Sequence, residues 1–178
     1  MEKLKQTFTI IDVENQFLDG QYVLHEDSCL MCSNLLYGNF QLLLGEGYHK
    51  SIGLDSGTGE CLSVYALLDA IDFEKATIIL PASQKGGLFF KCDSLKTQDG
   101  DHYIPFAENA YFDENQLILA FGDVTTSNGQ VIEFANDTYA KINDGCLLCI
   151  YVRVPPNAIE RIKTRKTKLK KWLNIFNK

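Results

Sequence analysis

The chain has 178 residues, of which 46% are hydrophobic and 22% charged, a balance typical of globular proteins that excludes a disordered or fibrous protein. No apolar run reaches the roughly 18 residues of a membrane-spanning helix. The N-terminal residues show no signal-peptide pattern. We therefore expect a cytoplasmic protein whose six cysteines are reduced thiols.

Charge is divided unevenly along the chain. Residues 161–178 hold 8 of the 17 basic side chains and no acid, whereas residues 1–160 hold 9 basic side chains and all 23 acids, a net charge of −14. An acidic body of this kind repels nucleic acid and attracts basic proteins. We therefore expect the body to bind a basic protein and not nucleic acid.

The first part of the chain alternates apolar and polar residues between short turns, the pattern of β-strands. The strands predicted there are residues 7–13, 22–24, 40–44, 48–54 and 61–67, and residues 28–37 are ambiguous. The glycine-rich turns at 45–47 and 55–59 join the last three of these strands into two successive hairpins.

The rest of the body continues in the same way, after a short helix predicted at residues 69–76. The further predicted strands are residues 77–80, 88–92, 117–121, 131–134 and 146–154. Strands joined by short turns pair antiparallel, because parallel pairs need long crossover connections. We therefore predict an α+β fold, mainly an antiparallel β-sheet of about 8–10 short strands with a C-terminal amphipathic helix.

The C-terminal segment alone has a helical period. Pro155 and Pro156 precede Asn157, which with Glu160 forms a predicted capping pair, so residues 1–156 form the body and residues 157–178 the helix. At 100° per residue one apolar stripe results, comprising Ile159, Ile162, Leu169, Trp172, Leu173 and Phe176. We expect the helix to dock on the body of the same domain, with the half around Trp172 as the better docking face.

An alternative for this helix is association with an anionic membrane, with nucleic acid or with a partner protein. A cationic amphipathic helix fits all three, because lysines attract anions while the apolar stripe inserts. The residues that would form this surface are Lys163, Arg165, Lys166, Lys170 and Trp172.

Residues 51–59, with the sequence SIGLDSGTG, resemble the first phosphate loop of the actin, sugar-kinase and heat-shock ATPase superfamily. The resemblance implies phosphate binding by Asp55, Gly57 and Thr58, and hence a small phosphate- or nucleic-acid-processing enzyme. The same residue types are also those that β-hairpin turns select for their backbone conformations. The segment thus predicts either a phosphate site or a plain hairpin turn.

Two Cys-x-x-Cys pairs, Cys29 with Cys32 and Cys146 with Cys149, provide the four thiolates of a structural zinc site, and His25 is a spare ligand. However, residues i and i+3 of a strand point to opposite faces, so a continuous strand cannot direct Cys146 and Cys149 to one metal. We therefore favour buried thiols, and no cofactor, with zinc as the alternative.

Residues 103–106 (YIPF) and 134–139 (FANDTY) are similar to the second half of the SUKH immunity superfamily, whose N-terminal signature this chain lacks. That resemblance implies an immunity-type protein. Together with the acidic body, it favours a non-catalytic intracellular binding protein or inhibitor that recognises a basic protein.

Overall fold

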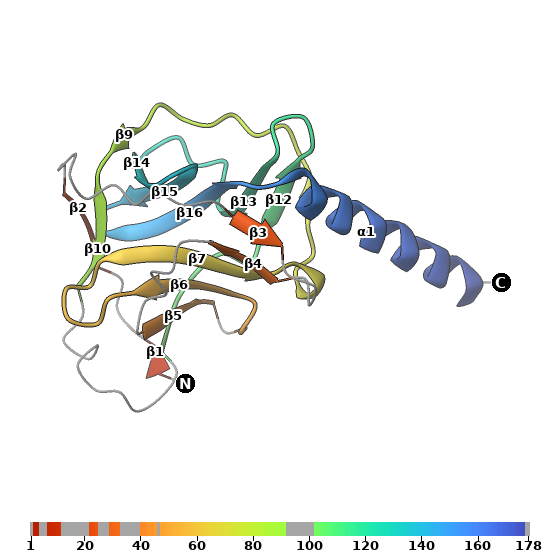
Figure 1. Cartoon of the computed structure of the whole chain (residues 1–178), viewed down its shortest axis with the longest axis horizontal. Coiled ribbons are helices and arrows are strands. Elements are labelled where there is room, and N and C mark those ends of the chain that lie inside the picture. The colour runs from red at the N-terminus through yellow and green to blue at the C-terminus, as the bar shows by residue number, and fades with distance from the viewer. Residues whose placement is uncertain are drawn as a thin grey trace.

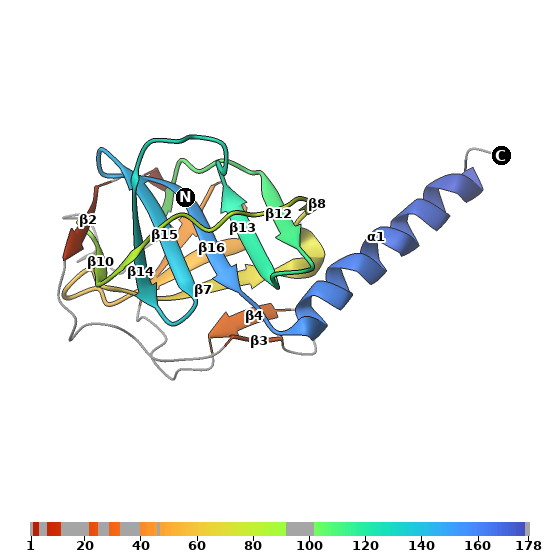
Figure 2. The same cartoon turned by 90° about the horizontal axis from the view of Figure 1, so that it is seen from above.

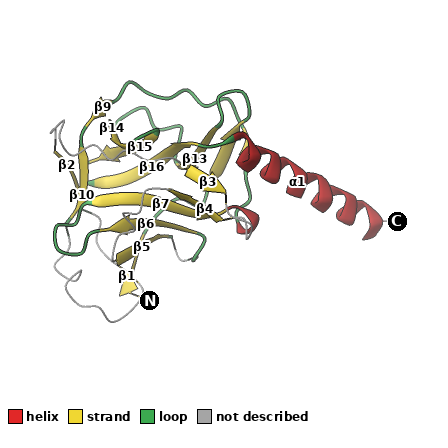
Figure 3. Cartoon of the chain, in the orientation of Figure 1, coloured by secondary structure: helices red, strands yellow, loops and turns green. Residues whose placement is uncertain are grey.

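The computed structural model describes residues 2–3, 7–11, 22–24, 29–32, 40–45, 47–91 and 102–176. Side chains are described for residues 7–11, 24, 40–45, 47–91 and 102–167. Within these ranges the chain forms β-strands, one short 3-10 helix, η2 (Leu68–Ala70), and one long helix, α1 (Pro156–Phe176) (Figure 3).

Two seven-stranded sheets contain most of the strands. The first consists, from edge to edge, of β1 (Glu2–Lys3), β11 (His102–Ile104), β5 (Phe40–Leu44), β6 (Lys50–Leu54), β7 (Cys61–Leu67), β4 (Cys29–Cys32) and β3 (Tyr22–Leu24). The second consists of β8 (Glu74–Lys75), β12 (Ala110–Asp113), β13 (Ile118–Gly122), β16 (Cys146–Arg153), β15 (Thr138–Asn143), β14 (Gln130–Ala135) and β9 (Gln84–Lys85). A separate pair, β2 (Phe8–Ile11) with β10 (Gly87–Phe90), lies at one end (Figure 1).

The pairing confirms the predicted fold class. Both hairpins form, β5 with β6 and β6 with β7, and the long strand β16 pairs antiparallel with both β13 and β15. Among the described strands, parallel pairing is confined to β11 with its two neighbours and to the two-residue edge strands β8 and β9. These very short strands raise the total among the described residues to sixteen, above the predicted number.

The core lies between the two sheets, which face one another as a sandwich. In strand β16, Ile150 and Val152 of the main core cluster alternate with Cys149 and Tyr151 of a second cluster. A register shift against β15 adds one residue to β16 after Leu147, which therefore also joins the main cluster. The second cluster includes Ile118 and Ala120 of β13 and lies on the outer face of the second sheet, away from the main core.

Residues 76–83, here called the strap, cross that outer face from β8 at one edge to β9 at the other (Figure 2). Ala76, Ile78 and Leu80 of the strap join the second cluster, while Ile79 is 83% exposed. The strand predicted at 77–80 is therefore wrong. Its apolar residues are real, but the segment packs by side chains across a sheet and pairs only at its two ends.

Helix α1 begins at Pro156, one residue before the predicted start. Proline is favoured at the first helical position because its missing N–H has no intrahelical partner there, so Asn157 lies inside the first turn. The first half of the helix is docked through Ala158, Ile159 and Ile162, which are at most 3% exposed. Beyond it the helix backbone runs away from the sheets in both views (Figures 1 and 2). The side chain of Trp172 lies outside the described residues.

Candidate functional site

The turn between β6 and β7 is closed by hydrogen bonds among its own residues. The Asp55 carboxylate oxygen Oδ1 accepts hydrogen bonds from the Gly57 amide at 2.9 Å, and from the Thr58 amide and hydroxyl at 2.8 and 3.0 Å. These bonds, led by that from the Thr58 amide, lower the pKa of Asp55. The amides that would approach a phosphate are thus donating to Asp55 itself, an arrangement typical of a turn that stabilises its own backbone.

The same turn cannot shift easily, because Gly59 has a φ of +79° and a Cβ there would overlap the carbonyl oxygen of Phe90. The Phe90 amide donates to the Gly59 carbonyl at 2.8 Å. Glycine is therefore required at this position by packing and conformation.

The cysteines with described side chains differ in exposure. Cys146 is exposed at the start of β16, and Cys149 is fully buried, with a pKa that burial raises to about 12. The side chains of Cys29 and Cys32, and residue His25, lie outside the described residues. Among the residues that the structure describes, no group of three His, Cys, Asp or Glu side chains is placed to hold a metal ion.

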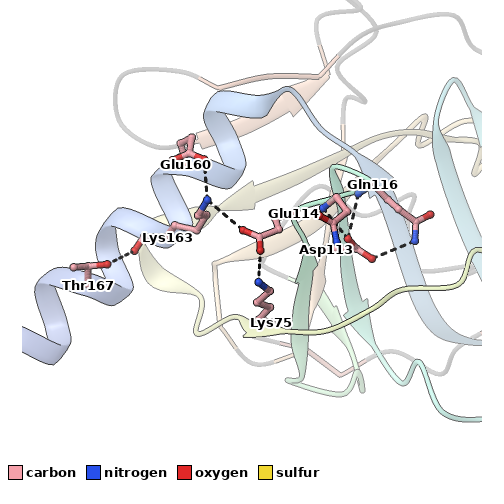
Figure 4. A network of polar contacts seen from close by, with 8 residues as sticks. Lys75, Asp113, Glu114, Gln116, Glu160, Lys163 and Thr167 are labelled. Atoms are coloured by element: carbon pink, nitrogen blue, oxygen red, sulfur yellow. Dashed lines mark hydrogen bonds and ion pairs between the residues drawn. The ribbon is translucent and has the colours of Figure 1, made fainter.

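Three of the predicted surface residues of the helix contact the body. Lys163 lies between Glu160 of its own helix, at 3.1 Å, and Glu114 of the turn after β12, at 3.2 Å, and Glu114 also pairs with Lys75 (Figure 4). These partners lower the pKa of Glu114 and raise that of Lys163.

Arg165 and Lys166 lie on the body-facing side of the same helix. Arg165 donates to the carbonyls of Leu68 and Ile71 at 3.1 and 2.7 Å, which satisfies backbone acceptors around η2. The Lys166 ammonium lies 5.7 Å from the ring centre of Phe112. Of the remaining predicted residues, Lys170 and Trp172 have no described side chain.

The strap is anchored by one buried carboxylate. Asp113, 3% exposed at the end of β12, accepts from the Ile78 amide at 3.0 Å and from the amides of Asn115 and Gln116 at 2.9 and 3.2 Å. The Gln116 side-chain amide donates to Asp113 (Figure 4). It also donates to the Ile78 carbonyl at 2.6 Å. Both polar groups of the strap at Ile78 are therefore satisfied from one turn.

A depression of about 390 Å³ lies where β2 meets the β15–β16 turn. Its lining residues are Phe8, Thr9, Ile10, Gln130, Ile142, Asn143, Asp144 and Gly145. The Phe8 amide donates to the Gly145 carbonyl at 2.8 Å, which joins the two segments. Figure 1 places β2 and β10 at the end of the body opposite α1, and this end is called the distal end below.

The chemistry of this depression is mixed. Phe8 and Ile142 are buried and form an apolar base, the Asp144 carboxylate is exposed at the rim, and the Thr9 hydroxyl oxygen is buried without a hydrogen-bond partner among the described residues. An apolar base with a carboxylate and a spare acceptor suits a long cationic side chain, whose stem is apolar and whose head donates hydrogen bonds.

More acid lies at the same end, in the β6–β7 turn. That turn carries Asp55 and Glu60, and it is joined to the depression through Phe90, whose ring centre lies 4.9 Å from that of Phe8. Burial and the Asp55 charge raise the pKa of Glu60. Sequence reasoning missed this site: the Asp144-Gly145 pair predicts a turn, but nothing in the sequence predicts that it meets Thr9.

The fold and sites define an antiparallel β-sandwich with a projecting basic helix. Comparisons of the chain with protein-family models, with characterised proteins and with solved structures give no significant match. No described helix combines the length and the apolarity that crossing a membrane requires.

Proposed function

We propose that this is a non-catalytic, cytoplasmic binding protein that recognises a basic protein partner through its acidic surface. The observation that carries the proposal is the depression at the distal end, with its Asp144 rim, unpartnered Thr9 hydroxyl and apolar base. A lysine or arginine side chain of the partner would lie along Phe8 and donate to Asp144. The net charge of −14 on residues 1–160 would speed association with such a partner. An immunity-type or inhibitor role is one form of this function.

The test is an NMR titration of the ¹⁵N-labelled full chain with a tri-arginine peptide at low salt. We expect shifts of the amides of residues 8–10 and 142–145, and weaker binding as salt rises, because screening shortens the reach of exposed charges. Asp144→Asn should weaken binding about fivefold, the upper range for an exposed ion pair. Asparagine suits this position because Asp144 has a φ of +48°, which Asn tolerates.

Asp72→Asn is the matched control, since it removes one exposed carboxylate at the other end of the body. It should leave the tri-arginine affinity unchanged. Equal weakening by both variants, or equal shifts with tri-glutamate, would show that the distal depression is not a specific cation site.

The alternative function is a phosphate- or nucleic-acid-processing enzyme that uses Asp55, Gly57 and Thr58. We place it second because the two amides of that turn donate to Asp55. Hydrolysis of a nucleotide or nucleic acid that Asp55→Asn abolishes, in a variant that remains folded, would reverse this order.

A further inference from the structure

The docked half of α1 meets the body at a defined place. Ile162 lines a small cavity with Leu68 of η2, Arg161 pairs with Asp69, and Arg165 bonds to the carbonyls at the two ends of η2. One face of the helix and the segment of residues 68–74 thus already form a matched basic and acidic pair within one chain.

The same helix face continues past the body. By the 100° period, Leu169, Trp172, Leu173 and Phe176 extend the stripe of Ile159 and Ile162 along a backbone that remains helical to Phe176. Figures 1 and 2 show this part of α1 leaving the sheets. Most helices in proteins owe their stability to packing of an apolar face. We therefore expect another surface to pack on this stripe.

Acceptors for the lysines lie at the base of the helix. Asp72 and Glu74 are exposed and form no ion pair with any residue that the structure describes. Asp72 lies beside Arg165 and Lys166, where η2 meets the helix. The projecting half of α1 carries Lys168, Lys170 and Lys171 and no acid. The same end of the molecule therefore presents both a basic apolar helix and exposed carboxylates.

We propose that two copies of the chain form a twofold dimer in which the projecting half of each α1 packs on the other copy's α1 and residues 68–74. Twofold symmetry uses each surface twice, so the lysines of each helix meet Asp72 and Glu74 of the other copy. The four aromatic rings of Trp172 and Phe176 in two copies bury roughly 600–1,000 Å². With the leucines, this approaches the standard interface area of about 1,200–2,000 Å².

A membrane fits this geometry less well. By the 100° period the stripe lies on the same helix face as Ile159 and Ile162, through which α1 docks. A bilayer that binds the helix would come close to the acidic body from which α1 projects (Figures 1 and 2). Anionic lipid would also repel a body with a net charge of −14.

The experiment is multi-angle light scattering of the full chain over a range of concentrations at 50 and 500 mM salt. We expect a mass approaching twice 20.1 kDa, with weaker association at high salt. The only tryptophan provides a second readout, a blue shift of its emission as the dimer forms. The Trp172→Ser/Phe176→Ser variant should be monomeric, with the circular dichroism of the sheets retained.

Charge exchange tests the pairing itself. Lys168→Glu/Lys171→Glu and Asp72→Lys/Glu74→Lys should each be monomeric alone, and their mixture should form a heterodimer. Lys85→Glu/Lys91→Glu makes the same charge change at exposed positions away from the helix and should leave dimerisation intact. A monomer at every concentration, a dimer that the helix variants do not alter, or a monomer that sediments with phosphatidylglycerol vesicles would each overturn the proposal.

Discussion

At the scale of single residues, Asp113 is a buried carboxylate that holds the strap to the turn after β12. One carboxylate satisfies donors of the strap and of its own turn, and no apolar residue of the same size could do so. Burial raises the pKa of Asp113, but the hydrogen bonds from Ile78, Gln116 and Asn115 outweigh it, and the pKa lies below its ordinary value. The sequence offers no sign of this, because a lone acid before a turn is common on surfaces.

We expect Asp113→Ala to lower the free energy of unfolding by roughly 2–4 kcal/mol, because it leaves buried amides without acceptors. The folded-state pKa is below the unfolded value of about 3.9, so the stabilisation is complete above that value and is lost as pH falls through the folded pKa. The difference between wild type and variant in urea unfolding should therefore shrink below about pH 4. A difference that stays constant from pH 7 to pH 3 would contradict this role.

At the scale of elements, the strap and the helix are the two segments whose packing the sequence did not predict. In both, some of the apolar residues that periodicity predicts are buried, namely Ile78 in the strap and Ile159 and Ile162 in the helix. Periodicity does not say which surface covers an apolar residue. It therefore predicts a strand at residues 77–80, where the strap packs by its side chains, and it predicts docking around Trp172, whose side chain lies outside the described residues. The docking that the structure describes uses Ile159 and Ile162 instead.

Ile162→Ala tests the helix junction. Ile162 is 3% exposed, and truncation of a buried isoleucine costs about 2–4 kcal/mol because a cavity remains. We expect this loss in urea unfolding, together with faster hydrogen exchange in residues 158–166. Thr164→Ala, at an exposed position of the same helix, is the control and should change stability little. Equal effects of the two changes would argue against docking through Ile162.

At the scale of the whole molecule, the sandwich has two apolar layers, one between the sheets and one between the second sheet and the strap. Cys61 lies in the core between the sheets, and Cys149 lies in the cluster beneath the strap. Both thiols are at most 1% exposed, and burial raises the pKa of each, so neither is a reactive thiolate in the folded state. Their labelling can therefore report separately on the two layers.

We expect iodoacetamide at pH 8 to label Cys146 in the folded protein and to leave Cys61 and Cys149 unmodified. With increasing urea, Cys149 should become labelled before Cys61, because the strap can open while the sheets remain packed. Mass spectrometry of single-cysteine variants gives the order. Simultaneous labelling would mean that the strap opens only with global unfolding.

The sequence by itself determined the fold class, both hairpins, the long central strand and the separation of charge, because alternation, turn residues and charge are local properties. Tertiary structure decided which apolar residues share a core, that the strap crosses a sheet, and that Thr9 meets Asp144. These outcomes depend on contacts between residues far apart in the chain, and no local pattern encodes them. For the basic helix, the sequence predicts the charge, and the tertiary structure decides that the helix projects beyond the body.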